Sequence, residues 1–228
     1  MNLKNLLIAT AIMLISAAAS AEEKYLPDQT LLFAVKGADS LYLDIYNPTD
    51  KLDPAKPTIL FMFGGGFKEG TRDSGHQWFK LLCAEGYPVV SIDYRLGLKD
   101  YKNAKLDLRF IKALDKSIAL AVEDLFSATA YLLENGEKYG VDARNMVLSG
   151  SSAGAISVLQ GEYEVCNRSE IAKVLPADFN YAGVMSFSGA IYSHHNPIKF
   201  YSQPCPIALF HGTADKIVPY KQIRLGRL

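Results

Sequence analysis

Residues 146–160 read MVLSGSSAGAISVLQ: an apolar run, a group of glycines and serines, and a second apolar run in immediate succession. Met146-Val147-Leu148 is typical of a strand, and Ala155–Leu159 can form a helix. Between them, Gly150-Ser151-Ser152-Ala153-Gly154 fits the pattern G-x-S-x-G with Ser152 at its centre. In this pattern the central serine is a nucleophile on a sharp strand-to-helix turn, and the glycines allow close packing around it.

Other interpretations of the motif stay open at the level of sequence. Serine and glycine also cap helices, so the motif alone is compatible with an ordinary helix start. Ser151 is a second serine, but it does not occupy the central position. The apolar strand before the motif favours Ser152 as a nucleophile, with the N-terminus of the following helix near the developing oxyanion.

Strands and helices are expected to alternate on both sides of this motif. Thr58–Phe63 is a continuous apolar run, as in a strand buried on both faces. The alternation predicts an α/β fold with a mostly parallel sheet flanked by helices, and with the first two strands as an antiparallel edge. The expected strands are 30–35, 41–46, 58–63, 88–93, 145–149, 181–187 and 206–210, and the expected helices are 76–85, a long amphipathic helix ending at Gly140, and 152–160.

Three consecutive glycines, Gly64-Gly65-Gly66, follow directly on the strand expected at 58–63. Glycine is costly in chain entropy, so the run indicates a need for backbone without side chains. A tight turn or a phosphate-binding loop is the alternative, but neither G-x-G-x-x-G nor Gly-Lys-Ser/Thr is present. Together with Ser152, the loop is interpreted as offering main-chain N–H groups to a substrate carbonyl.

A family resemblance appears when these segments are taken together. Phe63-Gly64-Gly65-Gly66-Phe67, Gly70-Thr71-Arg72-Asp73-Ser74, Asp93-Tyr94-Arg95-Leu96 and the Ser152 motif resemble the secreted bacterial carboxylesterase and feruloyl-esterase-like branch of the α/β-hydrolases. The resemblance covers residues 30 to 220 and implies the α/β-hydrolase fold. It also implies that the oxyanion donors are the N–H groups of Gly65, Gly66 and Ala153. Many relatives carry His or Tyr in place of Phe63, a change that leaves main-chain donors intact.

Asp215 matches the position of the catalytic acid in that branch. It lies in His211-Gly212-Thr213-Ala214-Asp215, after the strand expected at 206–210. The fold uses the chain order nucleophile, acid, histidine, and the acid fixes the tautomer of the histidine. An aspartate in an ordinary turn is the alternative interpretation.

The catalytic histidine has no candidate in the expected place, because no histidine follows Asp215. His211 precedes the acid and resembles a structural residue, His76 begins a surface helix, and His194 and His195 fall in a loop where solvation is expected. The sequence is therefore expected to be C-terminally truncated, lacking the last helix and strand of the fold, and inactive as given. A serine without a base is a poor nucleophile at neutral pH.

Met1–Ala21 is expected to be a cleavable signal peptide. Lys4 precedes an apolar run, Leu6–Ala19, and Ala19-Ser20-Ala21 offers small residues for cleavage. The run is shorter than the roughly 20 residues that span a bilayer, which argues against the alternative of an uncleaved anchor. The hydrolase domain is then 22–228, in a secreted or periplasmic protein with no stable membrane span.

Composition limits the partners. Lys and Arg number 24 and so do Asp and Glu, and this balance argues against nucleic acid or an anionic membrane as the main partner. The three cysteines, Cys83, Cys166 and Cys205, form no CxxC pair, so metal or redox work is not expected, and an odd count leaves at least one thiol unpaired. Cys83, in an apolar helical stretch, is expected to be a small buried hydrophobe.

The expected function is a serine ester hydrolase with no metal or organic cofactor. The resemblance implies a small-molecule or polysaccharide-linked ester as substrate, with acetyl or feruloyl groups as examples. A serine exopeptidase of the same fold and a non-catalytic interaction protein on a hydrolase scaffold are the alternatives. Four aromatic residues either line the substrate pocket or belong to the core: Phe67, Trp78, Tyr94 and Tyr192.

Overall fold

The computed structural model of the protein describes residues 24–48, 53–102, 107–193 and 197–221. The expected signal peptide, His194 and His195 lie outside these residues.

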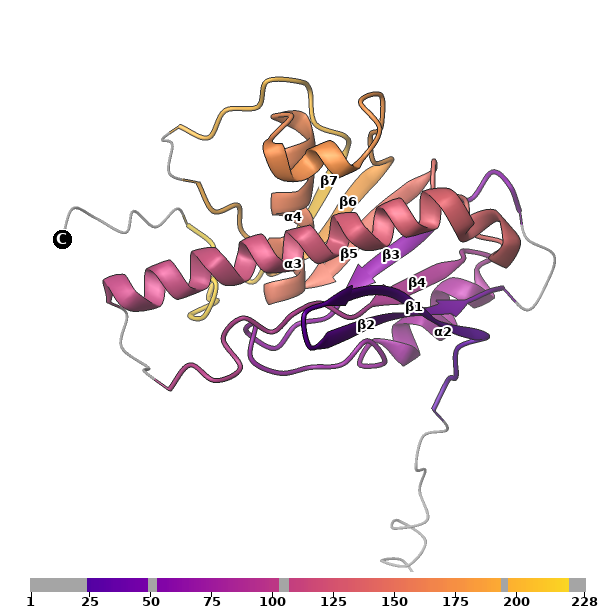
Figure 1. Ribbon diagram of the computed structural model, residues 1–228, viewed down its shortest axis with the longest axis horizontal. Helices are drawn as coiled ribbons and strands as arrows, with labels where there is room; N and C mark the ends of the chain where they lie inside the picture. Colours follow the sequence, from indigo (N-terminus) through magenta and orange to yellow (C-terminus); the bar gives the residue numbers. More distant parts are fainter. Residues whose placement is uncertain (1–23, 49–52, 103–106, 194–196, 222–228) are drawn as a thin grey trace, which may run out of the picture.

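A seven-stranded sheet forms the centre of the described part of the chain, in the order β1-β2-β4-β3-β5-β6-β7 (Figure 1). β2 is antiparallel to both β1 and β4, and all the other neighbours are parallel, which confirms a mostly parallel sheet with an antiparallel edge. The strands are β1 (Gln29–Lys36), β2 (Asp39–Tyr46), β3 (Thr58–Met62), β4 (Val89–Ile92), β5 (Met146–Ser151), β6 (Gly183–Phe187) and β7 (Ile207–Phe210).

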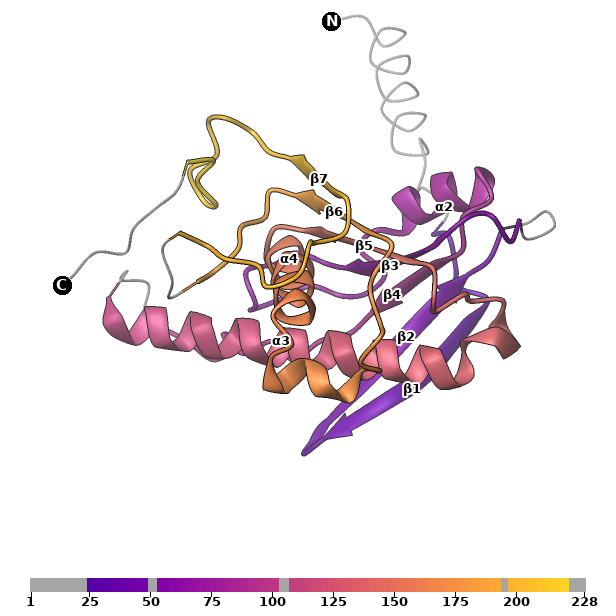
Figure 2. The ribbon, with the colours of Figure 1, turned by 90° about the horizontal axis from the view of Figure 1, so that it is seen from above.

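The central strands are buried on both faces because helices cover both sides of the sheet. Every residue of β3 and β4 is buried, as their continuous apolar runs predict. Helices α3 and α4 lie on one face and α2 lies on the other (Figures 1 and 2). The helices are α2 (His76–Ala84), α3 (Leu108–Asn135) and α4 (Ala153–Cys166), with short 3₁₀ turns η1 (Gly136–Tyr139) and η2 (Glu170–Val174).

The ends of α3 follow capping chemistry. The Asp107 side chain accepts hydrogen bonds from the N–H groups of Arg109 and Phe110 at the N-terminus. At the C-terminal end, Gly140 ends the helical segment as expected, but the last turn before it is a 3₁₀ turn and not part of the α-helix. The α-helix ends at Asn135, η1 continues the chain, and Gly140 adopts a left-handed φ of 74° that stops it.

Two elements around the serine motif are longer than the sequence predicts. β5 continues through Gly150 to Ser151, because Ser151 still pairs with Phe187 of β6. α4 continues to Cys166 rather than ending at Gln160. Its buried face includes the polar side chains of Gln160 and Glu162, which interrupt the apolar pattern from which the helix was expected.

Outside the centre, burial is uneven. Cys83 is buried, as expected, and its thiol donates to the Tyr46 carbonyl at 3.4 Å. β7 has β6 on one side and is poorly covered, with Leu209 66% exposed and Phe210 52% exposed. Among the described helices, none combines the length and the apolar character needed to cross a membrane.

Candidate active site

Ser152 occupies a sharp turn between β5 and α4, where its backbone has φ 50° and ψ −115°. A residue with a side chain rarely adopts a positive φ, and such strain persists only where the surroundings enforce it. Two hydrogen bonds do so: the Ser152 N–H donates to the Phe187 carbonyl at 2.8 Å, and the Ile156 N–H donates to the Ser152 carbonyl at 2.9 Å. The turn expected from the G-x-S-x-G pattern is therefore present.

The two glycines of the motif are required by close packing. A Cβ on Gly150 would lie 2.5 Å from the carbonyl carbon of Gly154. A Cβ on Gly154 would lie 2.1 Å from the carbonyl oxygen of Met62. The first turn of α4 thus rests directly on the end of β3, and this contact fixes where Ser152 stands.

The loop Gly64-Gly65-Gly66 lies beside Ser152. A Cβ on Gly64 would be 3.4 Å from the Ser152 Cβ and 3.1 Å from the Ser151 carbonyl oxygen. Gly65 has φ 121°, and a Cβ there would be only 1.9 Å from the Glu69 carbonyl oxygen. The loop therefore brings bare backbone next to the serine, as the run of glycines predicts.

Main-chain donors are free in this region. Within the described residues, the N–H groups of Gly65, Gly66 and Ala153 have no hydrogen-bond acceptor among the protein's own groups. The carbonyl of Gly65, by contrast, accepts from the N–H groups of Lys68 and Glu69 at 3.0 and 3.2 Å. The N–H groups of Gly65, Gly66 and Ala153 take no part in the turn that Lys68 and Glu69 close on the Gly65 carbonyl.

Tyr94 supports the strand end from which the glycine loop begins. Its hydroxyl donates to the Phe63 carbonyl at 2.8 Å, and its ring stacks on the Phe63 ring with centroids 4.5 Å apart. Tyr94 and Phe67 are 3% and 1% exposed, so both belong to the core. Tyr94 belongs to the motif Asp93-Tyr94-Arg95-Leu96, but its hydrogen bond to Phe63 was not predicted from the sequence.

Tyr94→Phe is expected to lower the free energy of unfolding by about 1–2 kcal/mol, because it leaves the buried Phe63 carbonyl without its donor while keeping the ring. Urea denaturation checks this. Tyr201→Phe is the matched control, because Tyr201 is 91% exposed and its loss of a hydroxyl should change stability by less than about 0.5 kcal/mol. Equal stability of the two variants would contradict the role given to the Tyr94 hydroxyl.

Arg72 ties the segment after the glycine loop to the sheet. Its guanidinium lies 2.8 Å from Asp44 of β2 and 2.9 Å from Asp93 at the end of β4. The Ser91 hydroxyl donates to the Arg72 carbonyl at 2.6 Å. Burial raises the pKa of Asp93, and the charge of Arg72 opposes that shift.

Asp215 lies in the loop after β7, with its side chain held by several groups. Its Oδ1 accepts from the N–H groups of Ile217 and Val218 at 2.8 and 3.0 Å. These two bonds lower the pKa of the Asp215 carboxyl, and His211 and the Ser188 hydroxyl act in the same direction. The side chain is therefore a carboxylate at neutral pH.

Neither described histidine has both ring nitrogens free. His211 Nε2 lies 2.7 Å from the Val218 carbonyl and 3.5 Å from Asp215 Oδ2. His76 begins α2, as expected, and its Nδ1 accepts from the Tyr25 N–H at 3.3 Å. These contacts fit a structural role for both residues.

The serine follows β5 and the acid lies in the loop after β7, with β6 between the two strands. Ser151 pairs with Phe187, and Phe187 pairs with Phe210, so the next residues of β5, β6 and β7 lead to Ser152, Ser188 and His211 at one edge of the sheet. Ser188 has a positive φ of 57°, and its hydroxyl adds to the lowering of the Asp215 pKa by the Ile217 and Val218 N–H groups. The sequence analysis missed Ser188, although a Ser-Gly pair directly after an apolar strand is a signal that could have identified it.

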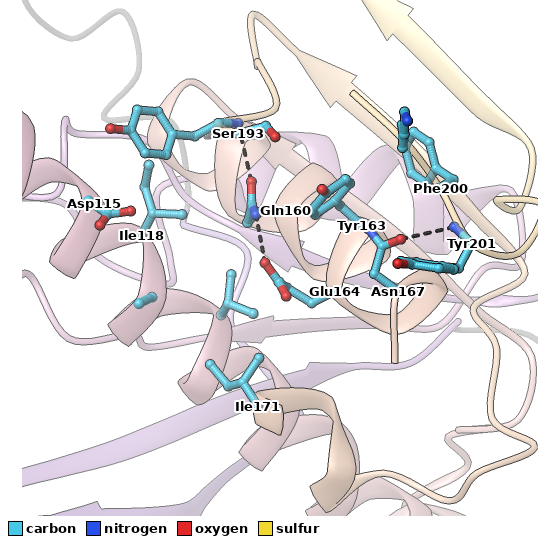
Figure 3. Close-up of a pocket in the computed structure, with 14 residues that line it drawn as sticks. Asp115, Ile118, Gln160, Tyr163, Glu164, Asn167, Ile171, Ser193, Phe200 and Tyr201 are labelled. Atoms are coloured by element: carbon cyan, nitrogen blue, oxygen red, sulfur yellow. Dashed lines mark hydrogen bonds between the residues drawn. The ribbon is translucent and has the colours of Figure 1, made fainter. Parts of the chain in front are cut away.

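A cavity of about 900 Å³ lies elsewhere, between α3, α4 and the segment after β6 (Figure 3). Its lining includes Tyr192, whose N–H donates to Gln160 at 3.2 Å, and Gln160 in turn donates to Glu164 at 2.7 Å. Ser152 and the glycine loop do not line it.

Of the aromatic residues considered for a substrate pocket, Tyr192 lines this cavity instead. Trp78 is 37% exposed and packs edge-on against Phe187. Within the described residues, no group of three or more His, Cys, Asp or Glu side chains could hold a metal ion.

Comparison with known proteins identifies the family. The chain matches the BD-FAE family over residues 43–189, more than half of its length. It belongs to the BD-FAE family. The matched residues extend from β2 to the end of β6 and include the glycine loop and Ser152 but not Asp215.

Several esterases and lipases resemble parts of this BD-FAE protein. Secreted lipase 1 of Botryotinia fuckeliana is 29% identical over 75% of this chain and 28% of its own length. Carboxylesterase 5A of Ovis aries is 33% identical over 53% of this chain and 30% of its own length. The chain thus spans less than a third of these relatives.

Among solved structures, propionate-bound esterase 2 of Thermogutta terrifontis has a TM-score of 0.63 and is 22% identical. The likeness covers 84% of this chain and 74% of that chain. Together with the sheet order and the helices on both faces, it confirms the α/β-hydrolase fold.

Proposed function

We propose that this protein is a serine ester hydrolase in which Ser152 is the nucleophile. The observation that carries the proposal is the strained Ser152 backbone, which has φ 50° and stands beside the glycine loop. Strain of this kind is retained where the surroundings enforce it, and at a strand-to-helix turn it exposes a nucleophile. The similarity of this protein to proteins named as lipases and esterases supports an ester as the substrate.

In the proposed reaction, the Ser152 hydroxyl attacks the ester carbonyl and forms a tetrahedral intermediate. The N–H groups of Gly65, Gly66 and Ala153 stabilise its oxyanion, and their lack of other acceptors supports this role. Collapse releases the alcohol and leaves an acyl-enzyme, which water then hydrolyses. These three N–H groups can stabilise the negative charge of the oxyanion without a cofactor.

Asp215 is the proposed acid of the triad. Its Oδ1 is occupied by two N–H groups, so Oδ2 is the oxygen that would orient a histidine. The proposed base is a histidine downstream of Asp215 and beyond the 228 residues, on a segment that packs beside β7. The exposed Leu209 and Phe210 of β7 support such a neighbour.

The proposal also includes a class of ester substrates. Small acyl esters, including acetyl or feruloyl esters of polysaccharides, are proposed as substrates of a protein exported through the signal peptide at residues 1–21. A panel of acetyl, butyryl and feruloyl esters alongside an aminoacyl p-nitroanilide separates an esterase from an exopeptidase. Faster cleavage of the anilide than of every ester would overturn the esterase assignment.

A fluorophosphonate probe is expected to label Ser152 in the protein expressed from its complete gene. Structures of the Thermogutta esterase phosphonylated by cyclosarin and phosphorylated by paraoxon make this class of probe appropriate. Ser152 lies in the tryptic peptide 145–168, so mass spectrometry can locate the adduct. Absence of label in folded protein would instead support a non-catalytic interaction protein.

A further inference from the structure

Two of the three cysteines meet at one buried carboxylate, away from the candidate active site. Glu162 of α4 is 3% exposed. Its Oε1 accepts from the Cys166 thiol at 3.2 Å and from the main-chain N–H of Cys205 at 2.8 Å. Because both groups touch the same oxygen atom, the Cys166 sulfur and the Cys205 backbone are close neighbours.

Further contacts hold the two chain segments together. The Ser202 hydroxyl and N–H donate to the Cys166 carbonyl at 3.0 and 3.3 Å, and the Tyr201 N–H donates to Asn167 at 2.9 Å. Residues 201–205 therefore run along the C-terminal end of α4. The Cys166 thiol donates to Glu162. Burial raises the pKa of the Cys205 thiol, and Glu162 and Cys166 add to that shift.

Cys83 has no part in this cluster. It lies in α2, on the opposite face of the sheet from α4, and its thiol bonds to the Tyr46 carbonyl (Figure 2). Of the three cysteines, Cys166 and Cys205 are therefore neighbours, and Cys83 is buried apart from them.

We propose that Cys166 and Cys205 form a disulfide by exchange with a small-molecule or protein disulfide. One cysteine thiolate attacks the oxidant and forms a mixed disulfide, releasing one thiol. The second cysteine thiolate then displaces the other thiol of the oxidant and closes the Cys166–Cys205 bond. The protein loses two electrons and two protons, and the oxidant gains them as two thiols.

The bond forms while the chain folds, before the cluster is enclosed. Burial, reinforced by Glu162, raises the pKa of the Cys166 thiol to about 11, and burial also raises the pKa of the Cys205 thiol. The docked thiols are thus poor sources of the thiolate that exchange requires. Oxidation removes the Cys166 thiol donor from Glu162, but a thiol is a weak donor and the Cys205 N–H remains.

The cross-link would close the chain from Cys166 to Cys205, and this loop contains β6. Phe187 at the end of β6 accepts the hydrogen bond from the Ser152 N–H. A covalent loop around β6 restricts the unfolded chain and stabilises the strand that holds the nucleophile turn.

The test is refolding of the wild-type protein in a mixture of reduced and oxidised glutathione, followed by alkylation and tryptic mapping without reduction. Each cysteine lies on its own peptide, 81–95, 145–168 or 200–216. The expected product is peptide 145–168 linked to 200–216, with Cys83 alkylated. Reduction is expected to lower the melting temperature by about 5–15 °C.

Cys83→Ala is the matched control and should keep both the linked peptides and the sensitivity to reductant. A double variant, Cys166→Ser with Cys205→Ser, should melt at the same temperature with and without reductant. Recovery of 145–168 and 200–216 as separate alkylated peptides, or either of them linked to 81–95, would overturn the proposal. Because mapping uses wild-type protein, poor folding of a variant does not obscure the result.

Discussion

Replacement of Ser152 with alanine is expected to lower kcat/KM for p-nitrophenyl acetate by on the order of 10⁴-fold or more in the protein expressed from its complete gene. Alanine removes the oxygen that would form the acyl-enzyme and leaves the main-chain donors in place. Initial rates at several substrate concentrations measure the loss, and the unchanged melting temperature shows that the fold is retained.

Ser151→Ala is the matched control, because Ser151 is the neighbouring serine and its side chain is exposed. It should retain activity to within about threefold, a change of less than about 1 kcal/mol. Loss of activity in Ser151→Ala together with its retention in Ser152→Ala would show that the nucleophile is assigned to the wrong serine.

Gly154→Ala is expected to lower the free energy of unfolding by about 3 kcal/mol or more, at or above the upper end of the usual cost of overpacking a core. Helix propensity alone favours alanine over glycine by about 1 kcal/mol. The new Cβ, however, would lie 2.1 Å from the Met62 carbonyl oxygen and 2.5 Å from that of Phe63. Both atoms are backbone at the end of β3, so the clash outweighs the helix propensity and α4 must shift.

Urea denaturation of Gly154→Ala measures this loss, and Gly212→Ala is its control. No atom lies within 4 Å of a Cβ placed on Gly212, and its φ is not in the left-handed region. The control should change stability by less than about 0.5 kcal/mol. A Gly154→Ala protein as stable as wild type would show that α4 does not rest on β3 as closely as described.

Much of the fold could be predicted because apolar runs and glycines have local causes. The runs at Thr58–Met62 and Val89–Ile92 are buried on both faces and predict central strands directly. Gly86 and Gly140 adopt left-handed conformations that few other residues tolerate, so they mark helix ends reliably. The turn at Ser152 could be predicted for a similar reason, because close packing requires the glycines on either side of it.

The remaining features depend on contacts between distant segments, which a single sequence does not reveal. Glu162 looks like an exposed helical residue, and its burial depends on Cys166 and Cys205 packing around it. The support that Tyr94 gives to Phe63 depends on sheet order, since β4 and β3 are neighbours only in the fold. Ser152 and Asp215 could be proposed from sequence because the motifs that contain them each follow an apolar strand.

Through the hydrogen bonds at the strand ends, the position of Ser152 depends on residues beyond those that it contacts directly. The Phe187 carbonyl holds the Ser152 N–H, and the Phe210 carbonyl in turn holds the Ser188 N–H one strand further out, each at 2.8 Å. The loop that carries Asp215 follows β7, so the turn at Ser152 and this loop are linked through the same two hydrogen bonds. β7, a strand with little cover, is thus connected to the serine through two hydrogen bonds. We expect substitutions on that outer strand to alter reactivity without changing any residue of the proposed catalytic set.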